Sequence, residues 1–217
     1  MAISDVRHLA TYRSPPGTVA GLAFVVAAAW AAVVVDRGPM HPDALGFVTA
    51  WTLMMAAMML PSAAPLVLLY RKTATPGRTA QLVAGYLVVW ASAGAGALVL
   101  DQASEDVPRW LALGVAGLYQ LTPLKRACLD RCRTPADFLV QRWRRSAFVL
   151  GLDHGLWCLG CCWALMIVLV AVGMMGIGWV LLLTALVAAE KLTAPGRTLA
   201  TVSGLTFALV ALLEVPR

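Results

Sequence analysis

Three cysteines lie within five positions of the apolar segment WCLGCCWALM, residues 157–166. On an α-helix, Cys158, Cys161 and Cys162 fall within an arc of about 100° together with His154, one turn earlier. Thiolate and imidazole are soft or borderline donors that select Cu(I), Zn(II) and related ions. We therefore predict a soft-metal site on this face of the helix. The alternative is that the cysteines pack as small hydrophobic side chains.

A second group of soft donors lies in the segment WTLMMAAMMLPSAAP, residues 51–65. Thioethers bind Cu(I) without the desolvation cost of a charged ligand, although methionine also fills irregular gaps between helices. Pro61 and Pro65 predict a break in the helix just beyond these side chains. Counted from the expected membrane faces, this segment and the cysteines lie at similar depth, so both helices could share one site. The predicted ligands here form two adjacent helical rows: Met54, Met55, Met58 and Met59.

Other residues are candidates for secondary sites. Cys128 and Cys132 are four residues apart in the basic segment KRACLDRCRTP, where the flanking Lys and Arg side chains are expected to lower the thiol pKa values. This pair predicts a cytoplasmic metal hand-off site or a redox pair. Glu190 is a candidate as an acid at the end of an apolar block, or is simply solvated beside Lys191. The remaining secondary candidates are in the turn GMMG: Met174 and Met175.

These residues are carried by a strongly apolar chain. Of its 217 residues, 60% are hydrophobic and 13% are charged, whereas a soluble domain is about 45–50% apolar and about a quarter charged. We predict a single all-α integral membrane domain over residues 1–217, a bundle of about seven transmembrane helices in contact with the lipid bilayer. The fourth block is the shortest and is alternatively re-entrant or tilted. The blocks span about 17–35, 44–70, 79–100, 108–124, 147–172, 174–190 and 197–213.

The basic residues indicate how the chain is inserted. Lys and Arg account for the net charge of +6 and lie between the apolar blocks, in connections that alternate between rich and poor. The connection 125–146 alone has seven of them. This pattern predicts a cytoplasmic N-terminus in a bacterial inner (cytoplasmic) membrane and argues against nucleic-acid binding. No nucleotide-binding loop, zinc-protease or serine-hydrolase motif is present in the sequence, which favours a metal handler over an enzyme.

The motifs resemble a known family. The matching segments are WTLMMAAMMLPSAAP, GYLVVWA, AGLYQLTPLKRACLDRCRTP, GLDHGLWCLGCCWALM and AAEK, which together cover roughly residues 45–195. The chain is similar to the bacterial predicted metal-binding integral membrane proteins catalogued as domain of unknown function 2182. Gly176 and Val180 stand where that family's pattern has Asn and Met. The resemblance implies an association with metal, without naming the ion or the reaction.

We therefore predict a soft-metal protein, with copper as Cu(I) the expected ion and zinc or another soft metal the alternative. It would act in metal transport, storage or delivery to a metalloenzyme, with a metallochaperone or membrane metalloenzyme subunits as partners. A second hypothesis is an intramembrane thiol-disulfide relay, because Cys158 and Cys161 have the spacing of a redox pair. A third is a non-catalytic membrane subunit of a larger complex.

Overall fold

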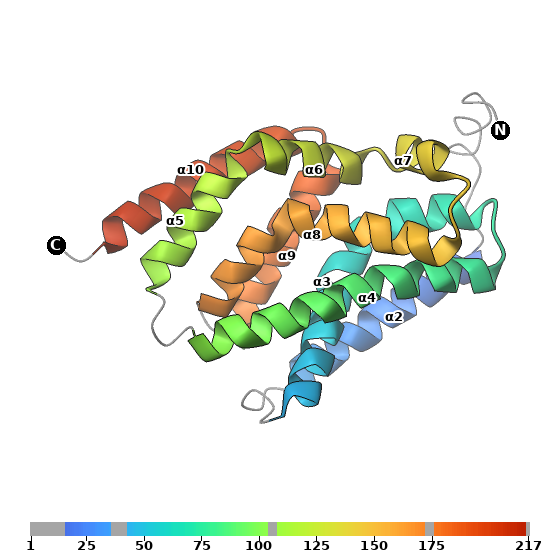
Figure 1. Ribbon diagram of the computed structural model, residues 1–217, viewed down its shortest axis with the longest axis horizontal. Helices are drawn as coiled ribbons and strands as arrows, with labels where there is room; N and C mark the ends of the chain where they lie inside the picture. Colours follow the sequence, from blue (N-terminus) through green and yellow to red (C-terminus); the bar gives the residue numbers. More distant parts are fainter. Residues whose placement is uncertain (1–15, 36–42, 104–107, 172–175, 216–217) are drawn as a thin grey trace.

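The computed structural model describes residues 16–35, 43–103, 108–171 and 176–215, and the regular secondary structure within these ranges is entirely α-helical. This confirms the all-α prediction (Figure 1). The nine helices of the described ranges are α2 (Pro16–Val35), α3 (Ala44–Arg71), α4 (Pro76–Ala103), α5 (Arg109–Gln120), α6 (Pro123–Arg133), α7 (Pro135–Arg142), α8 (Ala147–Ala171), α9 (Ile177–Leu192) and α10 (Gly196–Glu214).

Five of these helices, α2, α3, α4, α8 and α10, are long and apolar enough to cross a membrane. The chain is therefore a multi-pass membrane protein by helix length and composition. The predicted fourth and sixth spans contain shorter helices, because α5 has 12 residues and α9 has 16, below the roughly 20 needed to cross a bilayer at right angles. The fourth block is divided before Pro123, which occupies the first turn of α6, a position where its missing N–H leaves no helical hydrogen bond unmade.

The helices pack mainly as pairs of neighbours. α4 lies along α8, α5 lies along α10, and α3 lies between α2 and α4 in contact with both (Figure 1). The α4–α8 approach requires Gly151, where an added Cβ would overlap the backbone of Leu82. Small residues at such crossings bring helix backbones close together, which is how helices associate inside a membrane.

The helix α3 contradicts one expectation from the sequence. Pro61 and Pro65 lie inside it, yet the helix continues to Arg71, so the predicted helix break is wrong. Transmembrane helices tolerate proline where side chains and neighbouring helices satisfy the freed backbone groups. The hydroxyl of Ser62 donates to the carbonyl of Met59 at 2.8 Å in this region.

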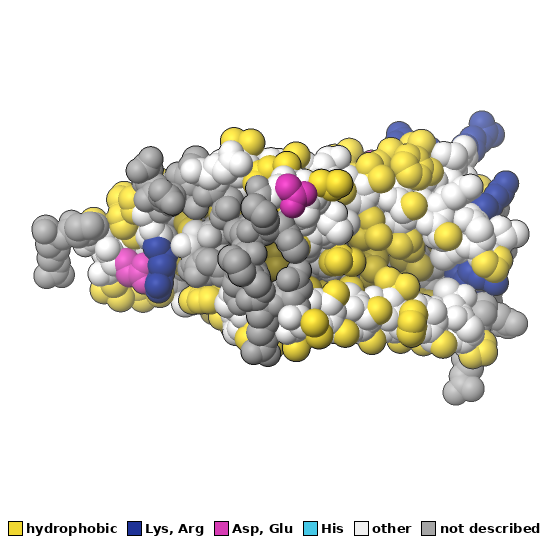
Figure 2. Space-filling model, turned by 90° about the horizontal axis from the view of Figure 1, so that it is seen from below, with side chains coloured by type: hydrophobic (Ala, Val, Ile, Leu, Met, Phe, Trp, Pro, Cys, Tyr) yellow, Lys and Arg dark blue, Asp and Glu magenta, His cyan; other side chains and the backbone are white. Residues whose placement is uncertain are grey.

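The surface separates an apolar middle from a basic end. Figure 2 shows hydrophobic side chains over the middle of the molecule and Lys and Arg side chains gathered toward one end. The α3–α4 turn and the connection from α7 to α8 lie at this end (Figure 1). These two connections and the helix ends beside them carry Arg71, Lys72, Arg78, Arg142, Arg144 and Arg145.

Candidate metal centre

The three cysteines of α8 are all buried free thiols, each with about 1% of its surface exposed. They do not all face the same neighbour. Cys158 and Cys162 belong to the buried cluster that contains the α3 methionines, whereas Cys161 packs beside Cys128 and Leu129 of α6. The helical face predicted from the sequence therefore lies between two helices, and its thiols divide between them.

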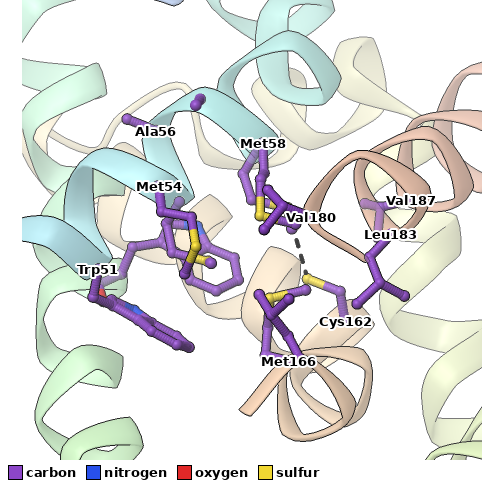
Figure 3. Close-up of a cluster of buried hydrophobic side chains, with 14 of the residues drawn as sticks. Trp51, Met54, Ala56, Met58, Cys162, Met166, Val180, Leu183 and Val187 are labelled. Carbon is purple, nitrogen blue, oxygen red and sulfur yellow. Dashed lines mark hydrogen bonds between the residues drawn. The ribbon is translucent and has the colours of Figure 1, made fainter. Parts of the chain in front are cut away.

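A sulfur contact across the bundle joins α8 to α3. Cys162 Sγ lies 4.0 Å from Met59 Sδ, the contact drawn as a dashed line in Figure 3. The side chains of Met58 from α3 and of Cys162 and Met166 from α8 point into the same interior (Figure 3). The structure thus brings the predicted methionine and cysteine groups together in one buried, sulfur-rich cluster. All four predicted methionines are part of it: Met54, Met55, Met58 and Met59.

Cys158 lies at the polar centre of this cluster. Its Sγ is 3.1 Å from Tyr86 Oη of α4 and 2.9 Å from Lys191 Nζ of α9. One turn later, the thiol of Cys162 donates to the carbonyl of Cys158 at 3.0 Å. A buried ammonium beside a thiol favours the thiolate, which is the form that binds metal.

Lys191 is a buried side chain rather than a loop charge. Only 5% of its surface is exposed, and besides Cys158 it contacts Ser62 Oγ at 3.4 Å. Its neighbour Glu190 is 1% exposed, so the alternative that this pair is simply solvated is wrong. Both residues lie in the last turn of α9, and α9 packs on α3. In the sequence, the only indication of this buried pair is that Glu190 and Lys191 end an apolar block.

The carboxylate of Glu190 already has partners in the protein. It accepts from Lys125 Nζ at 2.6 Å and from Gln120 Nε2 at 2.7 Å. Lys125 is fully buried and also donates to the carbonyl of Cys161 at 2.7 Å, so this ion pair joins α6, α8 and α9. In this arrangement Glu190 positions the cysteine helix, and its predicted role as a secondary metal ligand stays a prediction.

The α6 cysteines lie against α8. An added Cβ at Gly160 would come within 2.9 Å of Cys128 Sγ, so a glycine at this position lets α6 approach the backbone of α8. Cys132 packs against both the cluster that contains Cys158 and the cluster that contains Cys161. The sequence placed Cys128 and Cys132 at a separate cytoplasmic site; in the structure Cys132 extends the cluster of α8.

The expected lowering of the α6 thiol pKa values is wrong. Burial raises the pKa of Cys128. Hydrogen bonds with Cys158 and Cys161, together with burial, raise the pKa of Cys132 well above its ordinary value. The flanking basic side chains are engaged elsewhere, since Arg133 donates to the carbonyl of Glu190 at 2.5 Å. For Cys128, the lowering of the pKa by nearby Lys125 is smaller than the rise caused by burial.

His154 is buried between aromatic rings. Its ring centroid lies 5.8 Å from that of Tyr86 and 5.2 Å from that of Phe138. Its Nδ1 has no hydrogen-bond partner among the described residues. The histidine therefore retains a nitrogen that no described side chain uses, one turn before Cys158. Asp153, the neighbouring acid, instead forms ion pairs with Arg142 and Arg145.

Not every predicted ligand can be placed. Met174 and Met175 lie outside the described residues. Among the side chains that the structure describes, no three or more His, Cys, Asp or Glu groups are arranged to hold a metal ion. The closely spaced soft donors are instead two thiols and a thioether, with Tyr86 and Lys191 beside them. Cu(I), unlike Zn(II), readily accepts such a low number of sulfur ligands.

The family model PpoB2, described as a copper chaperone, matches residues 48–213. The chain belongs to this copper chaperone family. No curated protein and no solved structure gives a significant match to the chain. The match confirms the copper-related part of the sequence prediction, and the matched range of the copper chaperone family includes every predicted ligand.

The sequence did not predict several of the residues that surround the thiols of α8. Tyr86, Lys191 and Ser62 approach the cluster from three different helices, and Met166 lies two turns beyond Cys158 on α8. All four lie in segments that contribute to the family resemblance, but no helical spacing within those segments indicates that they meet the thiols.

Proposed function

We propose that the protein is an integral membrane copper chaperone that holds Cu(I) between α3 and α8 and delivers it to a membrane metalloenzyme or exchanges it with a metallochaperone. The observation that carries this proposal is the buried contact between Cys162 Sγ and Met59 Sδ, with Cys158 one turn away and beside Lys191. The family match to a copper chaperone supports the choice of ion.

The proposed ligands are Cys158 and Cys162, with Met59 as a third donor. The other soft donors form the surrounding shell and are candidates for intermediate ligation during transfer. These are Cys132, Cys161, His154, Met54, Met55 and Met58.

Charge balance favours Cu(I) over Zn(II) at this position. Two thiolates and one Cu(I) form a complex with a net charge of −1, which the ammonium of Lys191 at 2.9 Å from Cys158 neutralises. Zn(II) with the same thiolates is already neutral, so the lysine would remain as an uncompensated buried cation. An unpaired buried charge costs several kcal/mol, which is enough to discriminate between the two ions.

The α6 cysteines provide a route for transfer. Cys132 packs against the clusters that contain Cys158 and Cys161, and Cys128 lies one turn away along α6. Copper could move between these thiols by ligand exchange, with a new Cu–S bond forming before the previous one breaks. Met174 and Met175 would serve the opposite side of the membrane in the same scheme.

We also propose the full topology predicted from the sequence. In it α5 and α9 cross the membrane together with the five longer helices, helped by local thinning of the bilayer around short helices. The basic end of the molecule then faces the cytoplasm, as the positive-inside rule requires, and the N-terminus is cytoplasmic. A bacterial inner membrane and membership in the metal-binding family of the resemblance are part of this proposal.

The deciding experiment is element analysis of the protein purified without added metal, for the wild type and a Cys158→Ser/Cys162→Ser variant. We expect the wild type to retain copper and the double variant to lose it. Cys128→Ser is the matched control, because it removes a buried thiol outside the proposed ligand set. Equal copper content in all three proteins would refute the proposed site.

One contact favours a second function, a thiol-disulfide relay. Cys132 packs against the clusters that contain Cys158 and Cys161, so a disulfide between α6 and α8 is the bond that a relay would form. Alkylation of thiols in intact cells distinguishes the two functions. A relay accumulates a substantial oxidised fraction of Cys132, whereas a Cu(I) site requires reduced thiols.

A further inference from the structure

A cavity of about 460 Å³ lies at the basic end of the molecule, apart from the sulfur cluster. It is enclosed by the end of α3, the start of α4 and the connection from α7 to α8. Its volume is within the roughly 300–1,000 Å³ range of small-molecule pockets. The lining side chains that matter for the argument are Arg78, Arg144, Arg145, Gln81, Trp143 and Tyr70.

The cavity is electropositive. Three guanidinium groups line it, and no Asp or Glu is among its lining residues. The nearest partner acid, Asp153, is shared by Arg142 and Arg145. No ion pair to a described residue involves Arg78 or Arg144. Two of the three arginines are thus available to an anion in the part of the chain that the structure describes.

The ends of two long helices add to this field. α4 begins at Pro76 and α8 begins at Ala147, and residues of both first turns line the cavity. The N-terminus of a helix carries a partial positive charge and attracts anions, phosphate in particular. Side-chain and backbone charges therefore favour the same type of ligand.

The location indicates what form the anion takes. The cavity is level with the ends of three helices that can cross a membrane, α3, α4 and α8. Trp143 lines it and is 42% exposed, as expected for an aromatic side chain at the membrane–water interface. Gln81 and Tyr70 add neutral hydrogen-bonding groups beside the arginines. Basic pockets between helices at this level are typical sites for phospholipid head groups.

We propose that this cavity binds a phosphate ester anion through Arg78 and Arg144, supplied either by the head group of an anionic phospholipid or by a soluble phosphate ester. Planar guanidinium groups form paired hydrogen bonds with phosphate oxygens, which an ammonium cannot do. The site lies between the α3–α4 turn and the start of α8, so a bound head group would hold the α3 methionine helix and the α8 cysteine helix together at their basic ends.

The test is native mass spectrometry of the delipidated full chain in detergent, with phosphatidylglycerol, phosphatidylcholine and glycerol 3-phosphate as separate probes. We expect the wild type to prefer phosphatidylglycerol over phosphatidylcholine. An Arg78→Gln/Arg144→Gln variant should lose about fivefold in affinity per arginine, roughly 25-fold in total. The matched control is Arg126→Gln/Arg197→Gln, which removes the same charge from α6 and α10 outside the cavity.

The probes separate the two sources of phosphate. If a comparable concentration of glycerol 3-phosphate displaces phosphatidylglycerol, the cavity is a phosphate site whose ligand is a soluble ester. If it does not, the cavity is a phosphate site whose ligand is a phospholipid. Equal binding of the two lipids to the wild type would overturn the proposal, as would an equal loss of affinity in the control variant. The melting temperature, which should be the same in all variants, reports that each protein is folded.

Discussion

Lys191 offers the sharpest test of the proposed copper site. Its ammonium lies 2.9 Å from Cys158 Sγ in the interior of the protein. Lys191→Met removes the charge and keeps an unbranched apolar side chain of similar length. In this variant Cys158 must lose its proton for metal binding without a neighbouring cation to stabilise the thiolate.

The expected loss of Cu(I) affinity in Lys191→Met follows from the distance between the ammonium of Lys191 and the sulfur of Cys158. At an effective dielectric constant of about 20, two unit charges 2.9 Å apart attract each other by about 6 kcal/mol. Desolvation of both groups offsets part of this energy, and removal of one partner from a buried pair usually costs about 3–5 kcal/mol. We therefore expect the Kd for Cu(I) to rise by about 150- to 5,000-fold.

Zn(II) is the control ion and Lys191→Arg the control variant. Because the lysine opposes a neutral zinc–thiolate complex, Lys191→Met should change Zn(II) affinity little or raise it. Lys191→Arg keeps the positive charge and should preserve the preference for Cu(I). Competition titrations with Cu(I) and Zn(II) chelators measure both constants. The reasoning is refuted if Lys191→Met leaves the Cu(I) affinity unchanged or weakens the two ions equally.

Three further predictions concern the surroundings of the site. Lys125→Met leaves the buried carboxylate of Glu190 without its cation, so the free energy of unfolding should fall by about 3–5 kcal/mol, and adding Glu190→Gln should recover part of the loss in thermal unfolding. Met59→Leu conserves volume, so it should weaken Cu(I) binding while changing stability by less than about 1.5 kcal/mol, whereas Met54→Leu should affect neither; equal copper affinities would contradict the role of Met59. The raised pKa of Cys128 means that the folded state retains the thiol proton more strongly than the unfolded state, so stability should be constant below the ordinary thiol pKa of about 8.5 and decline above it. Melting temperatures measured across this pH range should decline less in Cys128→Ser, and identical profiles would show that the thiol does not contribute.

The helices that can cross the membrane were predictable from composition because hydropathy depends on each segment alone. Long apolar runs must form helices in lipid, since every backbone group has to be satisfied within the segment. Helix ends and interruptions were less predictable. α3 continues through Pro61 and Pro65, and the fourth block is divided at Pro123. The same residue type begins one helix and lies inside another, because neighbouring side chains and helices decide whether freed backbone groups are satisfied.

The chemistry of single helices was also predictable. The spacing of the α8 cysteines and of the α3 methionines follows from the 3.6-residue period, and both groups are buried as expected. Their similar depth in the membrane suggested a shared site, and the 4.0 Å contact between Cys162 and Met59 agrees with that expectation.

Tertiary packing alone decided the electrostatics of the cluster. Nothing in the periodicity of α9 indicates that Lys191 reaches Cys158, because a helical period describes one helix and not its neighbours. The approach of α6 to Gly160 likewise packs Cys132 against the clusters that contain the α8 thiols, a contact that the spacing within α6 does not reveal. The sequence by itself therefore determined which soft donors are present and which helical faces carry them. The three-dimensional packing determined which donors meet and placed a buried positive charge among them, and that charge is the basis of the proposed preference for Cu(I).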